Sequence, residues 1–235
     1  MKNKKLFFLT VVVTFMGLII FTTNLPTHSE EGKIDELPNE EKINEIPIVS
    51  STGNYINFEN LDTLEQNSEL IIIAQATENF EDREHINKYH ETPEDEYQPK
   101  FLIEGITKTK VNIKEILKQP EDEQYNEGEI ISVIEPISIF EDVDKVKKIK
   151  TVSNYKAIGT DNYILFLKKN SYGEYGVINM NNGRFNLSNN NEINTIKART
   201  ASEERELNAD ALQHQQIKET IFKKYDAEIK EIQNQ

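Results

Sequence analysis

Short hydrophobic runs separated by turn residues mark the centre of the chain, and residues 161–185 show this pattern most clearly. Residues 163–167 form a compact apolar run, which is followed by turn residues at 171–173. An extended pattern resumes at residues 175–180 and ends at a second turn, residues 181–183. Two strands and two turns in 25 residues predict an antiparallel meander. The centre of the protein is therefore expected to be a small β-sheet or barrel.

Three further segments have the composition of strands. Residues 70–77 begin with five consecutive apolar residues, as a buried strand does. Apolar and polar residues alternate within residues 106–117, which predicts one wet and one buried face. Residues 129–134 end before Pro136, because proline has no N–H group for a ladder. Together with the meander, these segments predict a mainly β (α+β) domain, an antiparallel barrel or strongly bent sheet of five or six strands.

The carboxy-terminal segment, residues 201–235, has a helical pattern instead. A stripe of mostly apolar residues recurs every three or four positions: Leu207, Ala211, His214, Ile217, Ile221, Tyr225, Ile229 and Ile232. We expect this stripe to pack on the chain's own domain. Pairing with a partner helix is the alternative, although strict heptads are few. The lysine-rich residues 137–151 fit a loop and an edge strand equally well.

The amino terminus has the layout of an export signal. Lys2, Lys4 and Lys5 precede an apolar run at residues 6–21, so residues 1–25 are predicted to be a signal peptide or a signal anchor. A run of about 16 residues is long for a signal and short for a membrane span, and no small-x-small cleavage motif follows it. We therefore expect an exported protein, either anchored in the cell membrane and facing outward, or secreted after cleavage.

Two acidic segments interrupt the expected domain plan. Residues 26–52 combine many glutamates with prolines and predict a disordered linker. The β domain is expected over residues 53–200, with a long acidic surface loop inserted at residues 78–100. The helix of residues 201–235 completes the chain.

The order of these segments resembles a family of uncharacterised extracytoplasmic proteins of Gram-positive bacteria. The matching residues are 68–74, 111–118, 128–133, 163–167, Tyr175 and 183–185. This resemblance implies an export signal and a small OB-like β-barrel, and it implies no catalytic residue. Gln119 and Pro120 stand where the family has a glycine, and the acidic loop is unusually long.

Composition narrows the classes of partner. The net charge of −14 argues against nucleic acid, because phosphate binding needs a basic surface. The absence of cysteine excludes disulfides, thiolate metal sites and a cysteine nucleophile. Weak binding of divalent cations is compatible with the charge, and His85, His90, Glu91 and Asp95 are the weak metal candidates. Their spacing matches neither a calcium loop nor a zinc-binding helix, so a solvated acidic loop is favoured and no cofactor is expected.

Candidate ligand contacts come from aromatic residues. Tyr163, Tyr172 and Tyr175 are candidates for a groove on the barrel, although core packing is the commoner use of such residues. No nucleophile or nucleotide motif is present, so no catalytic residue is assigned. The sequence favours a non-enzymatic surface module that binds a protein, peptide or envelope component. The alternative is an extracytoplasmic hydrolase that acts on cell-wall material through paired carboxylates.

The export prediction is tested by fractionating producing cells and sequencing the amino terminus of the product. We expect an outward-facing domain that is retained in the membrane by residues 1–25. A soluble product that begins between about Asn24 and Glu31 would refute the anchor and keep the orientation. A domain that resists protease added to wall-stripped cells would refute the outward orientation as well.

Overall fold

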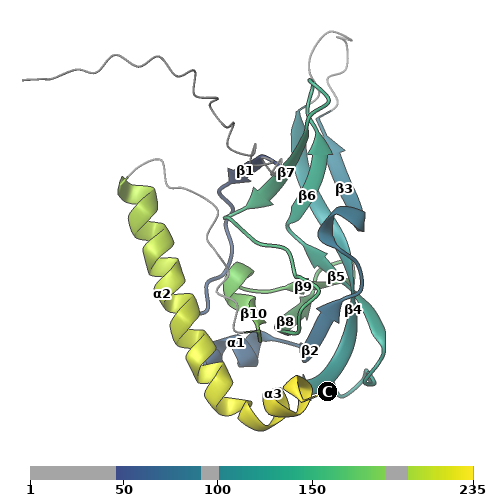
Figure 1. The fold of residues 1–235 in the computed structure, drawn as a ribbon, viewed down its shortest axis with the longest axis vertical. Helices are drawn as coiled ribbons and strands as arrows, with labels where there is room; N and C mark the ends of the chain where they lie inside the picture. Colours follow the sequence, from purple (N-terminus) through teal and green to yellow (C-terminus); the bar gives the residue numbers. More distant parts are fainter. Residues whose placement is uncertain (1–45, 91–100, 189–200, 235) are drawn as a thin grey trace, which may run out of the picture. The chain divides into compact units, whose positions relative to one another are not determined.

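Five strands close into a barrel, which occupies the lower half of Figure 1. The computed structural model describes residues 46–90, 101–188 and 201–234, so the predicted signal and most of the predicted linker lie outside the described residues. The barrel strands in spatial order are β2 (Leu70–Ala76), β4 (Leu102–Lys118), β5 (Ile130–Glu135), β9 (Tyr175–Val177) and β8 (Tyr163–Lys169). Strand β8 closes the ring by pairing with β2.

This arrangement confirms the predicted fold class: a mainly β protein with a barrel and a carboxy-terminal helix. The strand order is consistent with an OB-like barrel. One pairing differs from the expected antiparallel pattern. Strands β5 and β9 are parallel, with Val133 opposite Tyr175, whereas the other barrel pairings are antiparallel. The short strand β10 (Arg184–Asn186) pairs with β8 beyond the end of β9.

Strand β2 is buried on both faces, which explains its unbroken apolar run. Leu70 and Ile72 point into the barrel, where they pack with Val111 and Leu165. Ile71 and its neighbours on the other face pack against the helices instead. Because neither face meets water, the sequence has no polar alternation at these positions.

Three helices cover this outer face. They are α1 (Leu61–Asn67), α2 (Ala201–Lys224) and α3 (Asp226–Gln233). The side chain of Asn60 caps α1 by accepting from the N–H of Thr63 at 3.0 Å. Ile217 and Ile221 of α2 are buried against the barrel. The helix therefore docks through its second half.

A second, three-stranded sheet lies beside the far end of β4, towards the top of Figure 1. It contains β1 (Ile48–Ser51), β7 (Lys147–Val152) and β6 (Ile137–Glu141). The lysine-rich stretch is thus a β-hairpin rather than a loop, but β7 lies between β1 and β6, so only β6 is the edge strand that the second alternative predicted. The disordered linker predicted for residues 26–52 is wrong near its end, because residues 48–51 form strand β1. All four β1 residues are exposed, so the strand has no buried face for the sequence to reveal.

The acidic loop predicted for residues 78–100 is wrong at β3 (Glu84–Tyr89), which pairs with β4. Its inward side chains are mostly polar, so the sequence lacks the hydrophobic alternation that would have predicted this strand. Asn87 donates to the carbonyl of Ile139 at 2.8 Å, and His85 Nδ1 lies 2.9 Å from the Thr107 hydroxyl. These side chains connect β3 and β4 to β6 in place of apolar packing.

A fully buried carboxylate connects the barrel with two neighbouring segments of the chain. Glu135 Oε1 pairs with Arg83 Nη1 at 3.2 Å and accepts a hydrogen bond from Thr109. Glu135 Oε2 accepts from the Tyr155 hydroxyl at 3.0 Å and from the N–H of Ile158 at 2.7 Å. Burial raises the pKa of Glu135, while the bonds from Thr109 and Ile158 and the charge of Arg83 oppose this shift. The site therefore connects β5 with β4, the segment before β3 and the segment after β7.

Ile72 tests the barrel core. It has no exposed surface, so Ile72→Ala should lower the free energy of unfolding by about 2–5 kcal/mol. Chemical denaturation measures this change. The control is Ile56→Ala, because Ile56 is 74% exposed and should change stability by less than about 0.5 kcal/mol. Equal midpoints for Ile72→Ala and the unmodified protein would contradict the burial of β2.

His85 gives the fold a pH dependence. Burial lowers the pKa of His85, the backbone of Phe80 partly opposes this shift, and the positive charge of Arg83 adds to it. Nε2 is buried without a hydrogen-bond partner among the described residues, so the charged ring is disfavoured in the folded state. The unfolded chain therefore binds more protons just below about pH 6.5, the ordinary histidine pKa. The neutral His85 ring therefore makes its full contribution to stability above about pH 6.5, and this contribution is lost as the pH falls towards the lowered pKa of the folded state.

Denaturation curves at about pH 7.5 and pH 5.5 measure this effect. The His85→Gln variant should lose less stability between these conditions than the unmodified protein does. A matched control is His90→Gln, because His90 is exposed. Identical pH dependence for the His85 variant and the unmodified protein would contradict a neutral, buried ring.

Candidate functional site

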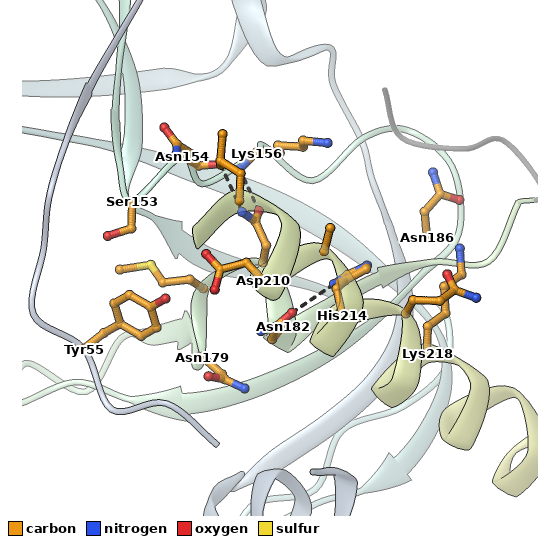
Figure 2. A pocket seen from close by; sticks show the side chains of 15 residues that line it. Tyr55, Ser153, Asn154, Lys156, Asn179, Asn182, Asn186, Asp210, His214 and Lys218 are labelled. Carbon is orange, nitrogen blue, oxygen red and sulfur yellow. Dashed lines mark hydrogen bonds between the residues drawn. The ribbon is translucent and has the colours of Figure 1, made fainter. Parts of the chain in front are cut away.

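A cleft of about 300 Å³ lies between the middle of α2, from Leu207 to Lys218, and the loops at one side of the barrel. Figure 2 shows the side chains that line it. The wall opposite α2 comes from the segment after β7, from the turn η2 (Met180–Gly183), and from Tyr55 in the connection between β1 and α1. This volume is at the lower end of the range for small-ligand pockets. We call this feature the cleft.

One face of α2 supplies the other wall. Its residues follow a three-and-four spacing and are Leu207, Asp210, Ala211, His214, Gln215 and Lys218. The adjacent Leu212 is 61% exposed and is not among the lining residues. The apolar stripe predicted from the sequence therefore serves two purposes: Leu207, Ala211 and His214 line the cleft, whereas the residues from Ile217 onward dock on the barrel.

Asparagine side chains build the wall opposite the helix. Asn179 has a left-handed backbone, with φ of 61°, and its amide makes two bonds to the backbone of Phe58, at 3.1 and 2.9 Å. Asn181 accepts from the N–H of Lys156 at 2.9 Å and donates to the carbonyl of Asn154 at 3.0 Å. These side-chain amides satisfy backbone groups that have no partner in a helix or strand, and they connect three segments that are far apart in the sequence. The wall is consequently held in one arrangement.

His214 is fixed at the middle of the helical wall. Its Nδ1 lies 3.2 Å from the amide oxygen of Asn182, so this nitrogen acts as the donor. Its ring stacks on Phe185 at 4.6 Å between centroids. Figure 2 shows the bond to Asn182 as a dashed line across the cleft floor. The ring therefore acts as a rigid surface and connects α2 to the η2 turn.

Asp210 and Lys218 place opposite charges in different parts of the cleft. Asp210 and Tyr55 lie at one end, whereas Lys218 and Asn186 lie at the other (Figure 2). Burial raises the pKa of the Tyr55 hydroxyl, and the negative charge of Asp210 raises it further. Lys156 adds a second lysine to the lining, and Asp210 is the one carboxylate among the lining residues that the structure describes.

The tyrosines predicted to form a groove do not lie together on one surface. Tyr163 and Tyr175 are 4% and 5% exposed and belong to the barrel interior, as their alternative role in core packing predicted. Tyr175 also donates to Glu123 at 3.2 Å and contacts the hydroxyl of Tyr125. Tyr172 is 87% exposed, at the turn between β8 and β9.

The metal candidates are not assembled within the described residues. His85 is half-buried between β3, β4 and β6, whereas His90 is exposed just after β3. Glu91 and Asp95 lie outside the described residues. Among residues 46–90, 101–188 and 201–234, no group of three or more histidine and carboxylate side chains is placed to hold a metal ion.

Comparison of the chain with protein-family models, with curated proteins and with solved structures finds no match. Within the described part of the chain, no helix has the length and apolar character needed to cross a membrane. The features of the cleft are therefore the basis on which a function can be argued.

Proposed function

We propose that this protein is an exported, non-enzymatic binding module that holds a peptide or another envelope component in the cleft. The observation that carries the proposal is a concave site whose walls are fixed by their own hydrogen bonds before any ligand arrives. Such preorganisation lowers the entropy cost of binding. Polar groups at its ends and apolar contacts from Leu207 and Met180 form the mixture that is usual in ligand sites.

The distribution of carboxylates favours binding over hydrolysis. Glycoside hydrolysis through acids uses two carboxyl groups that flank the scissile bond. Of the lining residues described, Asp210 alone has a carboxylate. His214 already contacts Asn182 and Phe185, which fits a structural wall better than a proton carrier.

The proposed location follows from the amino terminus and from the resemblance to extracytoplasmic proteins. Residues 1–25 carry the export pattern, and the described residues begin at position 46, near the end of the predicted acidic linker. In this proposal the domain faces outward from the membrane, where peptides and wall polymers are accessible to the cleft.

The proposal is tested with the full chain and digested Gram-positive cell wall, separated into peptide and glycan fractions. Ala211→Trp should fill the cleft from α2 and abolish the binding heat in calorimetry. Leu212→Trp is the matched control, because it places the same side chain one residue away on the exposed side of α2. It should bind as the unmodified protein does.

The chain contains no tryptophan, so each variant also carries one fluorescent reporter at a known position. Binding to Ala211→Trp that equals binding to the control would show that the ligand sits elsewhere. An absence of heat from both fractions with the unmodified protein would contradict the proposed function.

A further inference from the structure

The charge pattern along the cleft suggests a specific class of ligand. We propose, on the basis of the function proposed above, that the cleft binds a short peptide with both termini free. Its ammonium group lies at the end formed by Asp210 and Tyr55. Its carboxylate lies at the end formed by Lys218.

The spacing of the charges sets the length of this peptide. Asp210 and Lys218 are two turns apart on α2, and a rise of about 1.5 Å per residue separates their backbones by about 12 Å. An extended peptide spans about 3.3 Å per residue, so about four residues connect the two ends. A single amino acid would reach one charged end and leave the other unused.

The acidic end suits an ammonium group. Asp210 supplies a negative charge, and the Tyr55 hydroxyl beside it supplies an oxygen that accepts hydrogen bonds. Tyr55 is 40% exposed, so its ring borders the opening of the cleft. Both side chains are exposed, so a ligand ammonium group would bind here through charge-assisted bonds at the opening of the cleft.

The basic end is unusual for this protein. The chain has 41 acidic and 27 basic side chains, so most of its surface repels a carboxylate. The cleft nevertheless has Lys218 at this end, while its second lysine, Lys156, lies beside Asn154 (Figure 2). The ammonium of Lys218 lies 5.5 Å from the centre of the Phe222 ring, which is one turn further along α2 and is not among the lining residues, so the lysine side chain must turn to meet a ligand carboxylate.

The middle of the cleft provides partners for peptide groups. His214 lies between Asp210 and Lys218 on the helix, and Asn182 lies across from it at 3.2 Å. The amide of Asn182 can donate to a peptide carbonyl while its oxygen contacts His214. Apolar atoms of Ala211 and Leu207 leave room for small side chains.

The experiment uses the full chain and tetra-alanine in three forms: with free termini, with an acetylated amino terminus, and with an amidated carboxy terminus. The unmodified protein should bind the free form saturably in calorimetry. Acetylation or Asp210→Asn should each weaken binding about tenfold, and the two together should cause little further loss. Amidation of the peptide and Lys218→Gln should likewise each weaken binding about tenfold, with little further loss when the two are combined.

Two variants control for charge on the same helix. Glu204→Gln and Lys223→Gln remove exposed charges of α2 that do not line the cleft, and both should bind free tetra-alanine as the unmodified protein does. Coupling between acetylation and Lys218→Gln would overturn the proposed orientation. Equal binding of all three peptides would overturn the requirement for free termini.

The outcomes separate this inference from the proposed function. If no tetra-alanine binds but a wall fraction still binds and Ala211→Trp abolishes that binding, the peptide inference fails and the binding function stands. If neither tetra-alanine nor a wall fraction binds, both fail.

Discussion

The buried carboxylate of Glu135 is the constraint on which the arrangement of this protein depends. A charge enclosed without partners would be strongly unfavourable, so four groups from other segments must stay in place around it. Arg83, Thr109, Tyr155 and the N–H of Ile158 provide them. Removing one partner of such a buried pair typically costs about 3–5 kcal/mol. These contacts therefore hold the strands and loops that meet here in one arrangement.

This constraint reaches the cleft through the segment after β7. Tyr155 and Ile158 are held by Glu135, and the residues between them are held from the other side. Arg184 donates to the carbonyl of Ala157 at 2.9 Å, and Asn181 accepts from Lys156. One wall of the cleft is therefore continuous with the buried network, while the opposite wall rests on the docked half of α2. A ligand would meet a site that needs little ordering.

The barrel strands could be predicted because burial determines their sequence. The run at β2 is apolar on both faces, and β4 alternates, as the sequence pattern indicated. Strand β3 was missed because His85 and Asn87 point inward and bond to β6, so a buried face carries polar residues. The parallel pairing of β5 with β9 was missed because chain order does not show which distant strands become neighbours.

The cleft was less visible in the sequence than the barrel. Residues 181–183 were interpreted as a turn, yet Asn181 and Asn182 owe their roles to Lys156 and His214, which are distant in the chain. The helical stripe was predicted correctly, but periodicity does not distinguish a face that meets the core from one that meets a cavity. The asparagines at positions 179, 181 and 182 are the one signal in the sequence that could have pointed to this site, because several amide side chains near a turn can bond to distant backbone groups.

The central claim is that the cleft is the binding surface, and nuclear magnetic resonance of the full chain during titration with tetra-alanine tests it most directly. The account predicts shifts of the side-chain amides of Asn154 and Asn182 and of the α2 backbone from Leu207 to Lys218. The outer face of β4 and β5, including Lys110 and Ser132, should remain unchanged. Shifts confined to that outer face or to Tyr172, with the cleft amides unchanged, would contradict the account.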